Sequence, residues 1–169
     1  MNLRQLVPVF LTLVVAGCVR LPEQIEPVTG FEPERYLGTW YEIARLDHSF
    51  EEGLSQVTAE YSLREDGGIR VLNRGYSEEE GEWQEAEGKA YFVEDRITGY
   101  LKVSFFGPFY GAYGIFELDK EDYAYSWVSG PDTGYLWLLA RSPQVSDELK
   151  ERFIRRTSEL GFDTDELIW

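Results

Sequence analysis

Cysteine and histidine are almost absent from this chain of 169 residues, which contains one of each, Cys18 and His48. With a single cysteine no disulfide can form within the chain, so packing alone must stabilise the fold. A single histidine provides no pair of imidazoles for zinc, and a Ser-His-Asp triad would have to be built on His48. The sequence also lacks a phosphate-binding glycine loop. We therefore expect a protein that is not an enzyme and that has neither a metal site nor a cofactor.

Basic residues are scarce as well. Lys and Arg number 16 against 31 Asp and Glu, which gives a formal net charge of −15. A protein of this charge repels nucleic acid and anionic membrane surfaces, so we expect neither as a partner. The acidic runs at 78–80 and 119–122 are typical of solvated turns between strands.

Long apolar runs are missing too. The most apolar stretch, residues 6–15, has only about half of the ~20 residues that a membrane-spanning helix needs. It follows Arg4 and precedes the small residues Ala16 and Gly17. This order is typical of a secretory signal peptide, which we assign to residues 1–17.

The end of that segment, residues 15–18, resembles the lipobox of bacterial lipoproteins. The resemblance implies that Cys18 is acylated and becomes the lipid anchor. Several acyl chains are enough to hold a protein stably at a membrane. Val19, rather than aspartate, follows the cysteine, which favours the outer membrane, with the domain facing the periplasm. Residues 18–30 then form the lipidated N-terminus and a tether, and residues 31–169 form the domain. The alternative is an unanchored secreted protein.

Alternation of apolar and polar residues predicts one strand after another from Trp40 to Ala140. Residues 55–63 alternate throughout, and Gly67 and Gly68 then turn the chain. Another expected strand begins at Trp40. The remaining six span residues 69–74, 83–93, 99–106, 111–118, 123–129 and 135–140. Eight sequential strands predict an all-β fold, an up-and-down antiparallel β-barrel wide enough to hold one small ligand. After Ser146, a plausible N-cap, helical spacing predicts one C-terminal α-helix packed outside the barrel.

Two sequence motifs resemble the first and third signatures of the lipocalin family, in its bacterial branch. The match to the first signature is Gly38-Thr39-Trp40 within residues 35–45. The match to the third signature is Arg141 within residues 139–143. The resemblance implies that the Trp40 indole lies under the Arg141 guanidinium and closes the barrel floor beside Gly38. The second signature, Thr-Asp-Tyr, is matched in part, because Glu121 replaces the threonine before Asp122 and Tyr123.

Period-two alternation selects the side chains that should face the interior. If the Trp40 side chain points into the barrel, those of Glu42, Ala44 and Leu46 should point inward as well. We expect Glu42 either to pair with a tyrosine or to face a water-filled neck. The residues that we predict to contact ligand are Ala44, Asn73, Phe92, Val103, Phe105, Tyr113, Tyr135 and Trp137.

Such a lining suits a long apolar body with a polar head at the mouth. The expected ligands are fatty acids or lysophospholipids, which the protein would bind, store or transport in the bacterial envelope. An envelope adaptor without cargo is the competing hypothesis, with Tyr125 and Trp127 as an outer contact patch. A homodimer is compatible with either hypothesis.

Overall fold

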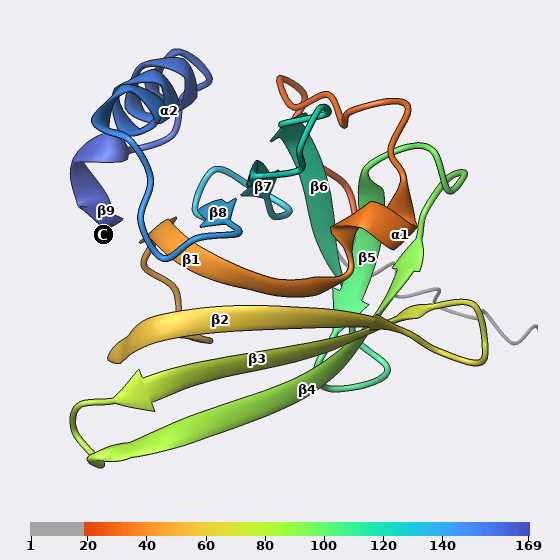
Figure 1. Ribbon diagram of the computed structural model, residues 1–169, viewed down its shortest axis with the longest axis horizontal. Helices are drawn as coiled ribbons and strands as arrows, with labels where there is room; N and C mark the ends of the chain where they lie inside the picture. Colours follow the sequence, from red (N-terminus) through yellow and green to blue (C-terminus); the bar gives the residue numbers. More distant parts are fainter. Residues whose placement is uncertain (1–18) are drawn as a thin grey trace, which may run out of the picture.

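The computed structural model describes residues 19–169 (Figure 1). The predicted signal peptide and Cys18 lie outside the described residues. The chain enters through a short helix, α1 (Pro33–Tyr36), and then forms one antiparallel sheet. Its strands are β1 (Gly38–Leu46), β2 (Leu54–Leu63), β3 (Ile69–Ser77), β4 (Glu82–Phe92), β5 (Tyr100–Ser104), β6 (Gly111–Leu118), β7 (Tyr125–Ser129) and β8 (Leu136–Ala140).

These eight strands close into a barrel. Each strand pairs with the next along the chain, and β1 pairs with both β2 and β8, so the sheet returns to its start. The register at closure joins Trp40 to Ala59 on one side and Tyr41 to Ala140 on the other. Closure leaves no exposed edge among these strands. The predicted barrel is confirmed.

Alternation along the strands produces two apolar clusters, one inside the barrel and one outside it. The inner cluster includes Trp40, Ile115 and Val128, which are fully buried. The outer cluster includes Leu136 and Leu138, which face the C-terminal helix. Two separate cores explain why a barrel without disulfides can bury enough apolar surface to fold.

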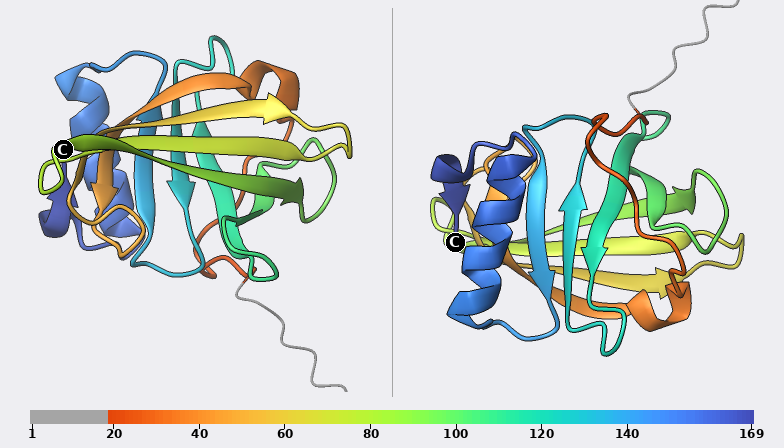
Figure 2. Two further views of the ribbon diagram at one scale, coloured as in Figure 1. Left: turned by 90° about the horizontal axis from the view of Figure 1, so that it is seen from below. Right: turned by 90° about the horizontal axis from the view of Figure 1, so that it is seen from above.

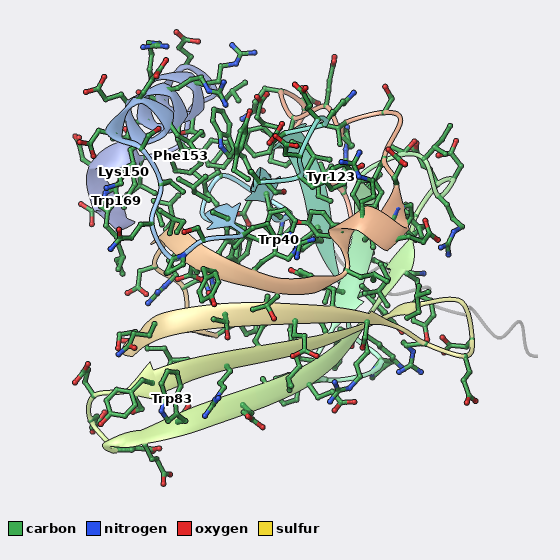
Figure 3. All side chains as sticks on the ribbon, in the orientation of Figure 1. Trp40, Trp83, Tyr123, Lys150, Phe153 and Trp169 are labelled. Carbon is green, nitrogen blue, oxygen red and sulfur yellow. The ribbon has the colours of Figure 1, made fainter. Side chains whose placement is uncertain are left out.

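The outer cluster includes Phe153 of the helix α2 (Asp147–Glu159), and this helix lies outside the barrel beside β8 (Figures 1 and 2). Ser146 caps it, because its hydroxyl accepts a hydrogen bond from the Leu149 N–H at 3.3 Å. Phe153 of this helix (Figure 3) is fully buried, and its ring lies edge-on to that of Trp127, with the ring centres 5.2 Å apart. Since Trp127 is only 1% exposed under the helix, the outer patch expected for an adaptor is not available.

After α2 the chain forms a 3-10 turn, η1 (Thr164–Glu166), and the short strand β9 (Leu167–Ile168). This strand pairs with the end of β1 through Arg45 and Leu46. Trp169 lies against α2, with its ring 6.5 Å from that of Phe153, and is half exposed. Across residues 19–169, no helix is both long enough and apolar enough to span a membrane.

The segment 19–30, expected as a tether, packs against the barrel instead. Leu21 and Ile25 are buried in the outer cluster, and Val28 donates a backbone hydrogen bond to Ile115 at 2.8 Å. Leu21 fills the space above Gly114, where a side chain would collide with it. All strands, helices and both clusters therefore lie within residues 21–168, so a protein beginning at Val19 retains every element that the structure describes.

Candidate functional site

The closed end of the barrel is built on Trp40 and Arg141. The Arg141 guanidinium lies 4.0 Å from the centre of the buried Trp40 ring, which confirms the implied stack. It also donates hydrogen bonds to the backbone carbonyls of Arg35, Leu37 and Thr39, at 2.7, 2.8 and 2.9 Å. One planar cation thus holds α1 and the start of β1 together.

Tyr123, from the partly matched second motif, fastens α1 from the opposite side. Its ring is buried near α1 (Figure 3), and its hydroxyl accepts a hydrogen bond from the Glu32 N–H at 3.0 Å. Arg35 lies over the same ring at 4.2 Å and donates to the Glu121 carbonyl at 2.6 Å. Residue 121 takes part in this contact through its backbone carbonyl. The contact is therefore compatible with glutamate in place of the threonine of the family signature.

Above this floor lies a cavity of about 350 Å³, within the range of small-molecule sites. Its walls are mainly apolar and come from strands all around the barrel, including Val57 and Ala59 on β2, Val71 on β3 and Ala90 on β4. The buried polar atoms on the wall that have no hydrogen-bond partner within residues 19–169 include Asn73 Oδ1 and Ser104 Oγ. They are available to a polar group of a ligand or to water.

Three tyrosine hydroxyls meet at the deep end of the cavity. The Tyr113 hydroxyl lies 2.9 Å from those of Tyr36 and Tyr61, and Tyr36 also reaches Ser126 Oγ at 3.1 Å. Burial raises the pKa of Tyr36 to about 12, so these hydroxyls stay neutral at physiological pH. The deep end thus combines aromatic walls with a neutral polar cluster.

A charged cluster lies nearer the mouth, between β1 and the β1–β2 loop. Arg45 donates to Glu42 Oε1 at 2.6 Å and to the backbone carbonyls of Glu51 and Leu54, both at 3.0 Å. Glu51 Oε2 accepts from the Trp137 indole at 3.1 Å and lies 3.1 Å from His48 Nε2. These contacts fix the loop across the mouth.

The two carboxyl groups in this cluster have different partners, which separates their pKa values: Glu42 contacts the Arg45 guanidinium, and Glu51 contacts His48 and the Trp137 indole. Burial and the nearby Glu51 raise the pKa of Glu42 to about 8 despite Arg45. Burial also acts to raise the pKa of Glu51, but the contacts with His48 and Trp137 and the positive charge of Arg45 outweigh it and lower that pKa. At neutral pH Glu42 is therefore mainly protonated and Glu51 is ionised.

The structure places six of the eight predicted ligand residues on the cavity wall. They are Asn73, Val103, Phe105, Tyr113, Tyr135 and Trp137. Their contact with a ligand remains a prediction.

The inward position of Ala44 was wrong. A β-bulge between Glu42 and Ala44 sets an extra residue of β1 against β8, which turns Ala44 outward into the cluster under α2. Arg45 points inward instead. Phe92 also lies off the cavity wall, because Phe31 packs against it at 6.3 Å and covers it near the floor.

Glu42 pairs with Arg45 rather than with a tyrosine. Sequence reasoning missed His48 and Glu51 as a pair on the cavity wall. Their spacing of three residues offered a weak signal, because it suits one turn of chain. Only the folded loop brings them beside Trp137.

A closed antiparallel barrel with an internal cavity and a sealed floor defines a protein built to enclose a small ligand. Residues 31–169 match the family model described as a lipocalin-like domain. The chain is 60% identical over 167 residues to the outer membrane lipoprotein Blc of Vibrio cholerae, covering 99% of this chain and 98% of that protein. It is 53% identical over 148 residues to the Blc lipoprotein of Escherichia coli K12, covering 88% and 83%. The chain belongs to the lipocalin family.

Solved structures give the same fold at lower identity. Insecticyanin from the tobacco hornworm Manduca sexta matches with a TM-score of 0.68 and 22% identity, over 88% of this chain and 84% of that one. This likeness supports the barrel alone.

Proposed function

We propose that this lipocalin is a lipid-anchored protein of the outer membrane that binds amphiphilic lipids with one acyl chain, such as fatty acids and lysophospholipids. The cavity carries this proposal, because its walls are apolar and its polar groups cluster at the deep end and near the mouth. An acyl chain suits the walls, while its head group can remain at the mouth.

The expected affinity follows from the buried length of the chain. About fifteen methylenes at ~0.8 kcal/mol each give a gross gain of roughly 12 kcal/mol. Immobilising protein and ligand removes a large part of this gain. A dissociation constant in the micromolar range or below is the expected result.

Two observations support the anchored location. Residues 15–18 form a lipobox-like sequence ending in Cys18, and the relatives from Vibrio cholerae and Escherichia coli are named outer membrane lipoproteins. The next residue, Val19, is bound to the barrel through a hydrogen bond from the Tyr100 hydroxyl to its carbonyl, so a lipid on Cys18 would hold the barrel close to the membrane surface. We propose that the barrel faces the periplasm.

A titration tests the cavity as the lipid site. Protein beginning at Val19 is titrated with oleate and with an oleoyl lysophospholipid while tryptophan fluorescence is followed, since Trp137 lines the cavity. We expect saturable binding of one lipid per chain. Ala90→Phe places a ring in the cavity and should weaken binding at least about tenfold.

Ala124→Phe is the matched control, because Ala124 is exposed in the turn between β6 and β7. It should bind like the unchanged protein. Equal affinities of the two phenylalanine variants, or no saturable binding at all, would contradict the proposed site.

A further inference from the structure

Three phenylalanines around the cavity mouth are largely exposed. Phe50 in the β1–β2 loop is 65% exposed, and Phe106 and Phe109 in the β5–β6 loop are 73% and 69% exposed. All three border the cavity. We call these three side chains the aromatic rim. Single exposed apolar residues are ordinary, whereas three gathered around one opening mark a surface that is covered in use.

The loop that carries Phe106 and Phe109 offers almost no polar specificity. Residues 105–110 contain no charged side chain, and the loop is held by a hydrogen bond from the Phe109 N–H to the Phe106 carbonyl at 3.1 Å. A protein partner is usually recognised through polar groups among the apolar ones. Apolar rings without charges suit instead the boundary between lipid head groups and acyl chains.

The start of the described chain packs on the outside of β5 and β6, the strands that the loop with Phe106 and Phe109 connects. The Val19 carbonyl accepts a hydrogen bond from the Tyr100 hydroxyl, and Leu21 packs on Gly114. In both views of Figure 2 this red segment lies beside the loop between β5 and β6. The proposed anchor, Cys18, directly precedes it in the sequence, so the membrane would lie within reach of the rim.

We propose that the aromatic rim docks onto the surface of a zwitterionic phospholipid bilayer, with the cavity mouth facing the lipid. The neighbouring loops carry the exposed acids Asp47, Glu52 and Asp132, which repel anionic head groups. Docking would let an acyl chain pass from bilayer to cavity with little exposure to water. The proposal goes beyond cargo binding, because it concerns the surface from which cargo enters.

Vesicle flotation tests this docking without the acyl anchor. Protein beginning at Val19, with folding checked by circular dichroism, is mixed with vesicles of phosphatidylcholine and phosphatidylethanolamine. We expect the unchanged protein to float with the vesicles. Phe106→Asp and Phe109→Asp should each require about tenfold more lipid. Replacing about a third of the lipid by phosphatidylglycerol should weaken binding, more so at low salt.

Ile97→Asp is the matched control, because Ile97 is 60% exposed but lies in the β4–β5 loop at the closed end. It should float like the unchanged protein. Ala90→Phe should also float, since it blocks the cavity and leaves the rim intact. Flotation by Ala90→Phe thus separates docking from cargo binding, and either proposal can fail alone.

Three results would overturn the docking proposal. One is flotation of Phe106→Asp equal to that of the unchanged protein, and another is an equal loss in Ile97→Asp. The third is no flotation together with a dimer in sedimentation that Phe106→Asp dissociates. That outcome would make the rim an interface between two copies of this chain.

Discussion

Replacing Arg141 by methionine should destabilise the barrel without touching the cavity. The variant loses three hydrogen bonds to the carbonyls of Arg35, Leu37 and Thr39, and the cation over the Trp40 ring at 4.0 Å. Hydrogen bonds from a charged donor are worth about 1.5–3 kcal/mol each when buried, and a cation–π contact about 0.5–2 kcal/mol.

Partial exposure of Arg141 reduces these values, because water can reach the vacated carbonyls. We therefore expect a loss of about 2–4 kcal/mol in the free energy of unfolding, or roughly 5–15 °C in Tm for a domain of this size. Arg141→Lys should lose less, since the charge remains over the indole while the planar fork is lost. Urea and thermal denaturation followed by circular dichroism measure both variants.

Arg156→Met is the control for this experiment. Arg156 is exposed on α2 and makes one surface ion pair with Glu159 at 3.2 Å, so its loss should cost less than about 0.5 kcal/mol. A loss for Arg141→Met no greater than for Arg156→Met would refute the account of the closed end.

Two further predictions concern the mouth and the outer core. Glu42→Gln tests the pKa of Glu42, raised to about 8. The folded protein keeps a proton that the unfolded chain loses above about pH 4.5, so stability falls as pH rises from about 5 to 8. In urea denaturation the free energy of unfolding of Glu42→Gln should fall less between pH 5 and pH 8 than that of the unchanged protein. The exposed control Glu79→Gln should show the full fall. The same pH dependence in both variants would contradict the raised pKa of Glu42. Phe153→Ala, at a fully buried position, should cost about 3–5 kcal/mol without changing lipid affinity. The half-exposed Ile154→Ala on the same helix should cost about 1 kcal/mol or less, and equal losses would show that α2 does not pack as described.

Strand positions and the closed end were readable from the sequence. Alternation requires only that each strand has an inside and an outside. It predicts one face for Val57, Ala59, Tyr61 and Leu63, and the first three are buried whereas Leu63, at the end of β2, is 52% exposed. The Trp40 and Arg141 motifs fixed the floor because the resemblance assigns both residues to one contact. The strand positions depend only on short stretches of chain, and the closed end depends on the single contact between Trp40 and Arg141.

The bulge in β1 could not be predicted in this way. Alternation assumes one residue per step, and an extra residue after Glu42 exchanges the faces of Ala44 and Arg45. The charged cluster at the mouth depends on that exchange, since it brings the Arg45 guanidinium to Glu42 and to the β1–β2 loop. The packing of residues 19–30 was missed because Pro22 and Pro27 interrupt the segment, so Leu21 and Ile25 predict no regular element there.

Native mass spectrometry tests the central claim, that the barrel cavity encloses one lipid, most directly. Protein beginning at Val19 is mixed with an oleoyl lysophospholipid or oleate and examined beside Ala90→Phe and Ala124→Phe. The account predicts one lipid per chain in the unchanged protein and in Ala124→Phe, and little or none in Ala90→Phe. Equal lipid occupancy in all three proteins would place the lipid elsewhere, and its absence from all three would contradict the proposed function.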